Sequence, residues 1–224
     1  MRLYILIVLF ITTFGLTGQE KGSSPFVQVV NGELVLAGER YCFIGSNYWQ
    51  GLNLGAPESG DRNRLLSELD QLQKLGVKNL RVLAASEADQ KMKYSFHPAL
   101  QNGPGEYDED LWKGLDFLLA EMKKRGMTAT MVLGNFWTWS GGFPQYLKWS
   151  GAGDLPFPQE EGTSWHEVTD DSKTFYSNEK AQKMMEDHIR KVINRNNHVT
   201  GEAYKEDPTI MAWQLANEPR GYDT

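Results

Sequence analysis

The connections along this chain are very unequal in length, and this constrains the fold more than any other feature. Apolar, strand-like runs at residues 77–83, 127–133 and 209–216 alternate with helical patterns. The connections from helix back to strand, at Gly76 and Gly126, are very short, whereas the loops after the strands are long and rich in Trp, Gly and Pro. Such alternation predicts parallel βαβ units. Long loops at one end of the strands are typical of a (β/α)₈ barrel, whose active site they build.

Three segments have the apolar spacing of amphipathic helices. Their apolar faces consist of Leu65, Leu66, Leu69, Leu72 and Leu75; of Leu111, Leu115, Leu118, Leu119 and Met122; and of Ala181, Met184, Met185, His188, Ile189 and Val192. Asp61 stands near the start of the first segment. The second segment begins with acidic residues and ends with basic ones, which suits the helix dipole. Ser177 is the predicted cap of the third helix.

Two features precede the alternating pattern. Residues 26–30 and 33–36 flank Asn31-Gly32, which predicts a β-hairpin with a tight turn. Residues 41–45 are then predicted to form a buried strand, with Cys42 as a small buried apolar side chain. Because Cys42 is the only cysteine, no internal disulfide framework is expected.

The number of strands is small for the predicted architecture. Four strands account for residues 41–217, and a closed barrel at this rate needs roughly twice as many residues. We therefore expect a (β/α)₈ TIM barrel truncated after about strand 4, with an N-terminal β-hairpin, in a partial domain spanning residues 19–224. Its exposed edge strand would make it poorly soluble. An open doubly wound sheet is the structural alternative, but residues 45–51 lack the Gly-rich phosphate turn of that fold.

The N-terminus and the charge restrict location and partners. Arg2 and the apolar run over residues 3–16 indicate a secretory signal peptide over residues 1–18, hence a secreted or periplasmic protein that is not membrane-bound after cleavage. A membrane anchor is the alternative interpretation.

The net charge of −6 argues against nucleic acid and anionic membranes, whereas a neutral polysaccharide is a compatible partner. The four histidines show no metal-ligand spacing, so we expect no metal and no cofactor. We expect the complete protein to be a monomer.

A carboxyl group and an arginine occupy positions at which barrel enzymes carry their chemistry. Asn217-Glu218-Pro219 ends the apolar run at 209–216, and Pro219 cannot continue a central strand. Glu218 is therefore expected at the carboxyl end of a strand, the catalytic position of a barrel, with Asn217 beside it to bind a hydroxyl. Arg81 lies midway along an otherwise apolar strand, where it needs a carboxylate partner. Such a pair is either a structural ion pair or a means of orienting a catalytic carboxylate.

Aromatic and amide side chains follow the other predicted strands. They are Asn47 and Trp49 after the first strand and Asn135, Trp137 and Trp139 after the third, with Trp149 and Trp165 in the long loop beyond. Trp faces suit the apolar C–H faces of sugar rings, and amides suit the sugar hydroxyls. The sequence therefore predicts a carbohydrate-binding cleft, in which one or two of these rings serve only loop packing.

From about residue 26 onward the chain resembles glycoside hydrolase family 5, and within it the endo-β-1,4-mannanases. The resemblance is carried by the leading hairpin and by Phe43-Ile44-Gly45-Ser46-Asn47-Tyr48-Trp49, Leu80-Arg81-Val82-Leu83-Ala84-Ala85-Ser86-Glu87, Gly114-Leu115-Asp116-Phe117-Leu118-Leu119-Ala120-Glu121, Arg125-Gly126-Met127, Asn135-Phe136-Trp137-Thr138-Trp139-Ser140-Gly141-Gly142 and Trp213-Gln214-Leu215-Ala216-Asn217-Glu218-Pro219-Arg220. It implies a retaining double displacement on β-mannan, glucomannan or galactomannan.

The same resemblance implies roles for individual residues. Glu218 matches the general acid/base, Asn217 the residue that binds the 2-hydroxyl of the sugar at the cleaved bond, and Arg81 the arginine that holds the nucleophile. The nucleophile glutamate itself is expected beyond Thr224, so this incomplete N-terminal part should be inactive alone. Two alternatives remain: an inactive or carbohydrate-binding fragment, and a β-1,4-glucanase of the same family.

Overall fold

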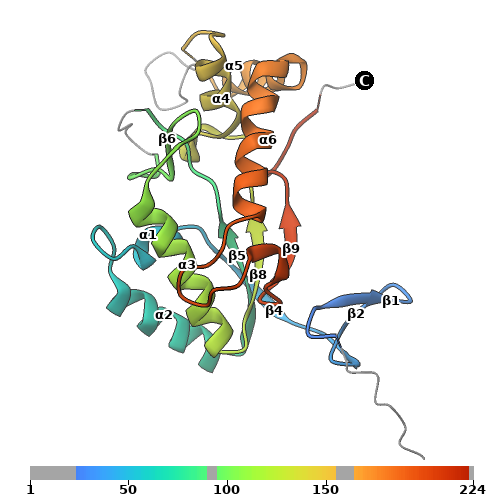
Figure 1. The fold of residues 1–224 in the computed structure, drawn as a ribbon. Coiled ribbons are helices and arrows are strands. Elements are labelled where there is room, and N and C mark those ends of the chain that lie inside the picture. Colours follow the sequence, from blue (N-terminus) through green and yellow to red (C-terminus); the bar gives the residue numbers. More distant parts are fainter. Residues whose placement is uncertain (1–23, 90–94, 155–163, 222–224) are drawn as a thin grey trace, which may run out of the picture.

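A four-stranded parallel sheet forms the centre of the fold. The computed structural model describes residues 24–89, 95–154 and 164–221, and the expected signal peptide lies outside them. The strands lie side by side in the order β4 (Ile44–Tyr48), β5 (Val77–Leu83), β8 (Thr128–Val132) and β9 (Ile210–Gln214) (Figure 1). All three neighbouring pairs are parallel, which confirms the predicted βαβ units. Because spatial order follows chain order, the loop after each strand lies next to the loop after its neighbour.

Three long helices follow the sequence pattern closely. They are α2 (Arg62–Lys74), α3 (Glu109–Lys124) and α6 (Glu179–Ile193). Asp61 caps α2 by accepting a hydrogen bond from the Arg64 N–H at 3.0 Å. Asp108 caps α3 by accepting bonds from two backbone N–H groups of its first turn. These side chains satisfy donors that have no partner inside the helix, so they define where each helix begins.

The cap of α6 differs from the prediction. Asn178, and not Ser177, precedes the first helical residue, and its Oδ1 accepts a hydrogen bond from the Ala181 N–H at 3.0 Å. Ser177 ends a short 3₁₀ turn, η2 (Thr174–Ser177), where its hydroxyl donates to the Thr174 carbonyl instead. Asn and Ser are equally good caps, so the neighbouring turn decides between them.

The two faces of the sheet differ in chemistry. Toward the helices, Leu80 of β5 and Met131 of β8 are fully buried in one large core that includes the leucines of α3. On the opposite face, Asn79 donates a hydrogen bond to Thr128 at 2.9 Å, and Arg81 lies one pleat further along β5. The apolar face therefore holds the helices, and the polar face leads toward the loops at the carboxyl ends of the strands.

The first and last strands of the sheet are less buried than predicted. The expected strand at residues 41–45 begins only at Ile44, whose exposed fraction is 65%, and Cys42 is exposed. In β9, only Ile210 is buried and the other residues are half-buried. Both strands are edge strands of the sheet with a single neighbour each, which explains why apolar sequence there is not covered within the described residues.

The predicted hairpin is confirmed at the other end of the molecule. Strands β1 (Gln28–Val30), β2 (Glu33–Leu36) and β3 (Glu39–Arg40) form an antiparallel sheet. The turn residues Asn31 and Gly32 have φ angles of 52° and 82°, as a type I′ turn requires. Figure 1 shows this small sheet near the amino ends of the central strands, away from their carboxyl ends.

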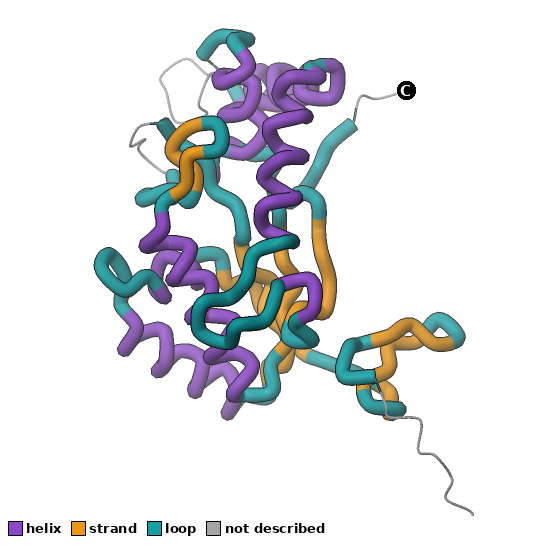
Figure 2. Tube along the Cα trace, in the orientation of Figure 1, coloured by secondary structure: helices purple, strands orange, loops and turns teal. Residues whose placement is uncertain are grey.

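Several elements in the connections between the central strands were not predicted. They are α1 (Gly51–Gly55), β6 (Gln101–Gly103), β7 (Glu106–Tyr107), η1 (Thr138–Ser140), α4 (Gly142–Ser150), α5 (Trp165–Lys173) and η3 (Tyr204–Glu206), together with η2. Figure 2 shows the helices α4 and α5 gathered beyond the carboxyl ends of the strands. Among the described helices, none has the length and apolar character needed to cross a bilayer.

One close backbone contact fixes α1, and with it one wall of the carboxyl-end loops. A Cβ atom on Gly114 of α3 would lie 2.1 Å from the Leu52 carbonyl oxygen, and one on Gly55 of α1 would lie 2.3 Å from the Gly114 carbonyl oxygen. Both distances are far below van der Waals contact, so only glycine allows the two helices to approach this closely.

We predict that Gly114→Ala lowers the free energy of unfolding by about 1–3 kcal/mol, although alanine is the better helix former, because the methyl group must push two backbones apart. Urea denaturation of the purified full-length protein measures this. Lys113→Ala, on the exposed side of the same helix, is the control and should stay within about 0.5 kcal/mol of the wild type. Equal stability of the two variants would contradict the prediction.

Candidate active site

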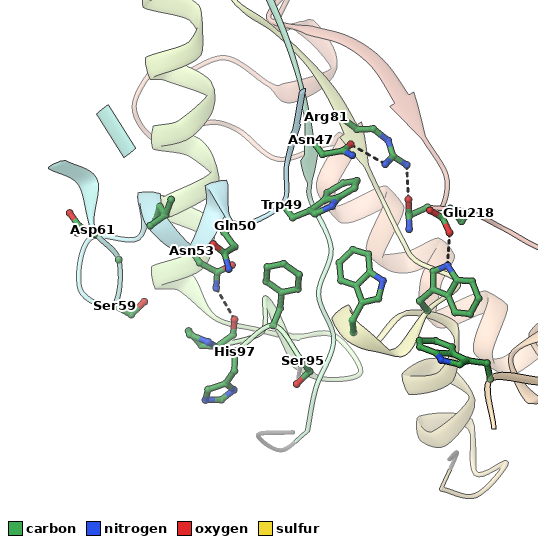
Figure 3. Close-up of a pocket in the computed structure, with 18 residues that line it drawn as sticks. Asn47, Trp49, Gln50, Asn53, Ser59, Asp61, Arg81, Ser95, His97 and Glu218 are labelled. Carbon is green, nitrogen blue, oxygen red and sulfur yellow. Dashed lines mark hydrogen bonds between the residues drawn. The ribbon is translucent and has the colours of Figure 1, made fainter. Parts of the chain in front are cut away.

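The loops at the carboxyl ends of the strands surround a cleft of about 1080 Å³ (Figure 3). Seven of the predicted site residues line it: Asn47, Trp49, Arg81, Trp137, Trp139, Asn217 and Glu218. In the figure, Glu218 and Arg81 lie toward one end, and Ser59 and Asp61 mark the other. The structure therefore brings together side chains from four segments that are far apart in the sequence, at or after the carboxyl ends of β4, β5, β8 and β9.

Glu218 follows β9 in an unusual backbone conformation. Its φ angle is 47°, in the left-handed region that non-glycine residues seldom adopt, at a cost of order 1–3 kcal/mol. The Trp137 Nε1–H donates a hydrogen bond to Oε2 of Glu218 at 2.8 Å. The position of the carboxyl group is thus set by the backbone conformation of Glu218 and by the hydrogen bond from the Trp137 indole. Strain of this kind, maintained by surrounding contacts, is a reason to look for function at this residue.

Arg81 projects from β5 into the same region and is surrounded by amide oxygens. Its guanidinium donates to Gln214 Oε1 at 2.8 Å, to Asn217 Oδ1 at 2.8 Å and to Asn47 Oδ1 at 3.3 Å. It also lies over the Trp49 ring, 4.6 Å from the centroid. Among the described residues, three neutral amides and no carboxylate accept hydrogen bonds from the guanidinium, so the expected carboxylate partner stays a prediction. Burial lowers the pKa of Arg81, and the negative charge of Glu218 opposes this effect.

Asn135 was predicted to contact substrate, and the structure corrects this. Its side chain is fully buried and does not line the cleft. Its Nδ2 donates to Ser140 Oγ at 2.9 Å, and its Oδ1 accepts from the Trp137 N–H at 3.2 Å and from Asn217 Nδ2 at 3.1 Å. Asn135 lies three residues after the end of β8, and its buried amide ties the loops after β8 and β9 together.

The aromatic side chains form two groups along the cleft. Trp139 contacts Trp49 and Phe96, with ring centroids 5.8 and 5.4 Å apart. Trp137 meets the half-exposed Trp165 edge-on at 5.5 Å. Flat apolar surfaces with nearby amides are suited to sugar rings. Trp149 instead packs against a smaller buried cluster that includes Phe143 and Tyr146 of α4, as expected for one or two of the loop tryptophans.

Sequence reasoning missed several cleft residues. Gln50 and Asn53, at the start of α1, and Phe96 and His97, in the loop after β5, all line the cleft. Phe96 and His97 could have been indicated only by the length of the loop after β5. Among the described cleft residues the carboxylates are Glu218 and Asp61, at opposite ends in Figure 3, and Asp61 is engaged as a helix cap. The described residues contain no group of three metal-ligating side chains.

Comparison with known proteins places this geometry among carbohydrate-active enzymes. The family model described as GH family 5 beta-mannosidase-like matches residues 24–224. Mannan endo-1,4-beta-mannosidase 1 of Solanum lycopersicum is 34% identical over 201 residues, which are 89% of this chain and 45% of that protein. The chain thus spans less than half the length of that curated relative.

Solved structures give a similar result. The glycoside hydrolase family 5 mannosidase from Rhizomucor miehei is 44% identical, with a TM-score of 0.83 over 87% of this chain and 49% of its own. The same values hold for a mutant of it in complex with mannosyl-fructose. The endo-beta-1,4-mannanase from Thermotoga petrophila is 28% identical, with a TM-score of 0.61 over 80% of this chain and 35% of its own. The fold is therefore that of a (β/α)₈ barrel, of which the described strands form part.

Two buried titratable groups lie behind the cleft loops. Nε2 of His188 lies 3.1 Å from the Ala84 carbonyl oxygen, and because a carbonyl only accepts, Nε2 carries the proton while Nδ1 accepts from the Tyr107 hydroxyl. Burial lowers the pKa of His188 to about 4, against the opposing effect of that carbonyl. Burial raises the pKa of Glu87 to about 7, against hydrogen bonds from the Gly142 N–H and Tyr146. Both groups are therefore mostly neutral near pH 5.5.

These shifts make opposite contributions to stability between pH 4.5 and 6.5. The folded pKa of His188 lies below its unfolded value, so its contribution is complete above about pH 6.5 and is lost toward pH 4. The folded pKa of Glu87 lies above its unfolded value, so its contribution is present below about pH 4.5 and is lost as the pH rises to about 7. The neighbouring tyrosines, Tyr107 and Tyr146, stay protonated because burial raises the pKa of each.

We predict that the pH-dependent contributions of His188 and Glu87 to the free energy of unfolding largely cancel in the wild type. Each becomes visible when the other residue is replaced. Relative to wild type, His188→Gln should lose less stability on acidification from pH 6.5 to 4, and Glu87→Gln should lose less on going from pH 4.5 to 7. Each difference should reach up to about 3 kcal/mol. Urea denaturation of the full-length proteins across this range measures it. Parallel pH profiles for all three proteins would contradict the prediction.

Proposed function

The chain belongs to glycoside hydrolase family 5, in its β-mannosidase-like group, and we propose that the whole protein is a retaining endo-β-1,4-mannanase. It would hydrolyse internal β-1,4-mannosidic bonds of mannan, glucomannan or galactomannan. The observation that carries the proposal is a strand-end carboxyl group, Glu218, held by Trp137 in a tryptophan-lined cleft. Mannan endo-1,4-beta-mannosidase relatives from tomato and Arabidopsis thaliana, of which the chain spans 45% and 46%, support the substrate class.

In this proposal, Glu218 acts as the general acid and then as the general base. Of the two carboxyl oxygens of Glu218, only Oε2 forms a hydrogen bond with a described residue, which leaves Oε1 for the glycosidic oxygen. The acid first protonates the leaving oxygen, and the resulting carboxylate later takes a proton from the attacking water. Asn217 gives one N–H to Asn135, so its second N–H remains for the 2-hydroxyl of the sugar.

A retaining mechanism needs a second carboxyl group about 5–5.5 Å from the first. Asp61 is unsuited, because it caps α2 and lies at the far end of the cleft in Figure 3. The proposal therefore assigns the nucleophile to the part of the family domain that this chain does not span. Arg81, held by neutral amides close to Glu218, would orient and stabilise that carboxylate.

A second candidate is an exo-acting β-mannosidase of the same family. The Rhizomucor miehei mannosidase shares 44% identity with this chain, against 28% for the Thermotoga petrophila endo-beta-1,4-mannanase. Product analysis separates the two, because an endo-enzyme releases a range of oligosaccharides from long mannan chains whereas an exo-enzyme releases mannose first.

Residues 1–18 support the further proposal that the protein is secreted.

We predict that Glu218→Gln in the full-length enzyme abolishes cleavage of natural mannan while substrate binding changes little. Glutamine keeps the shape but has no proton to give. An aryl mannoside with a good leaving group needs less acid assistance, so its first step should survive better. Asp61→Asn is the matched control, because it removes the other cleft carboxylate and preserves the cap. Equal losses on both substrates in Glu218→Gln would exclude the acid role.

We also predict that the full-length enzyme prefers β-1,4-mannan over soluble cellulose by at least about 100-fold in kcat/KM, or ~2.7 kcal/mol. Mannose differs from glucose in its axial 2-hydroxyl, and a buried amide placed for one epimer is left unpaired by the other. Parallel assays on the two polymers measure the ratio. Comparable rates would favour the β-1,4-glucanase alternative, and binding without turnover would favour the carbohydrate-binding alternative.

A further inference from the structure

Glu87, in the loop after β5, is a buried carboxyl group that the proposed mechanism does not use. It is 1% exposed. Its Oε2 accepts a hydrogen bond from the Gly142 N–H at 2.9 Å, and its Oε1 accepts one from the Tyr146 hydroxyl at 3.1 Å. No ion pair joins it to a cation in the described part of the chain. A buried carboxyl group without a countercharge is costly to ionise, so its two hydrogen bonds are the contacts that account for it at this position.

The carboxyl group of Glu87 satisfies the beginning of helix α4. Gly142 is the first residue of α4, and the preceding Gly141 has no side chain that could accept its N–H. The first N–H groups of a helix have no partner inside it and favour a negative charge nearby. Glu87 therefore acts as a cap from a distant part of the sequence.

The main chain is held at the same place. The Glu87 N–H donates to the Ser140 carbonyl at 2.8 Å. A Cβ atom on Gly141, whose φ is +89°, would lie only 1.9 Å from the Glu87 carbonyl oxygen. The two loops are thus in backbone contact, and no side chain separates Glu87 from the segment it holds.

That segment leads directly to the catalytic carboxyl group. Ser140 accepts a hydrogen bond from Asn135, which in turn accepts from the Trp137 backbone N–H. The Trp137 indole then donates to Glu218 at 2.8 Å. Each link is a hydrogen bond between described residues, so a shift of the segment at Glu87 has a short path to the Trp137 ring.

We propose that Glu87 is a positioning residue: by anchoring residues 135–142 at the start of α4, its side chain places the Trp137 indole against Glu218. The part of the proposal that concerns catalysis rests on the proposed function, whereas the placement of the indole does not. What matters is the reach of the side chain to the Gly142 N–H. Reach and the titratable carboxyl group can be separated, because aspartate keeps the carboxyl group and loses the reach, and glutamine keeps the reach and loses the carboxyl group.

The test uses Glu87→Asp and Glu87→Gln in the full-length protein labelled with ¹⁵N-tryptophan. The Trp137 indole N–H resonance is assigned from its absence in Trp137→Phe. We expect Glu87→Asp to move this resonance and Glu87→Gln to leave it near its wild-type position. Glu121→Asp is the matched control, since Glu121 is also a buried glutamate, bonded instead to Lys124 and Arg125 of the same helix end. It should leave the resonance unmoved.

The kinetic arm measures hydrolysis of mannan by the same variants, corrected for the folded fraction. We expect Glu87→Asp to lower kcat by about 10- to 100-fold with KM changed by less than about threefold, because misplacement of a catalytic group by about 1 Å has an effect of that size. Glu87→Gln should retain kcat within about threefold. If the wild type does not hydrolyse mannan, the proposed function fails while the resonance still tests the placement.

Two outcomes would overturn the inference. In the first, Glu87→Asp is folded and shows both the wild-type resonance and the wild-type kcat, so that reach to Gly142 has no effect. In the second, Glu87→Gln is impaired and Glu87→Asp is not, so that the titratable carboxyl group of Glu87 matters instead of its reach. A merely structural role would lower stability in both Glu87→Asp and Glu121→Asp without moving the Trp137 resonance in either.

Discussion

The candidate site depends on one guanidinium that holds the carboxyl ends of three strands together. Arg81 of β5 bonds to Asn47 at the end of β4 and to Gln214 and Asn217 at the end of β9. A guanidinium has five donors in a rigid fork, so these contacts fix the spacing of the strand ends. Because all three acceptors are neutral, the positive charge is not cancelled where it is held. Its field remains available to carboxyl groups in the cleft, of which Glu218 is one.

Much of the central fold could be predicted from local sequence because the signals are themselves local. The acidic residues near the starts of the helices, such as Asp61 and Asp108, could be identified because a cap acts within its own turn. Asn31-Gly32 indicated the hairpin because a type I′ turn requires two positive φ angles, which these residue types tolerate. By contrast, α4 begins at Gly142 and contains Pro144, a pattern typical of a turn. Its first N–H is capped by Glu87, a long-range contact that no local pattern indicates.

The sequence predicted which residues line the cleft better than it predicted the contacts between them. Glu218 and the cleft tryptophans could be identified because strand ends and aromatic loops are visible in the sequence. The amide partners of Arg81 and the burial of Asn135 could not, since both depend on which loops become neighbours in space. The edge positions of β4 and β9 likewise explain why their apolar residues are less buried than their hydropathy predicts.

At Glu218, the left-handed backbone conformation creates a conflict between the stability of the fold and the proposed function. Glycine would adopt the observed φ of 47° without strain, so Glu218→Gly would be expected to relieve a cost of order 1 kcal/mol and also to remove the carboxyl group. A search for more stable variants that ignored activity would therefore tend to replace the proposed acid/base residue first. Engineering of this domain for heat resistance would need to hold residue 218 constant and seek its gains elsewhere.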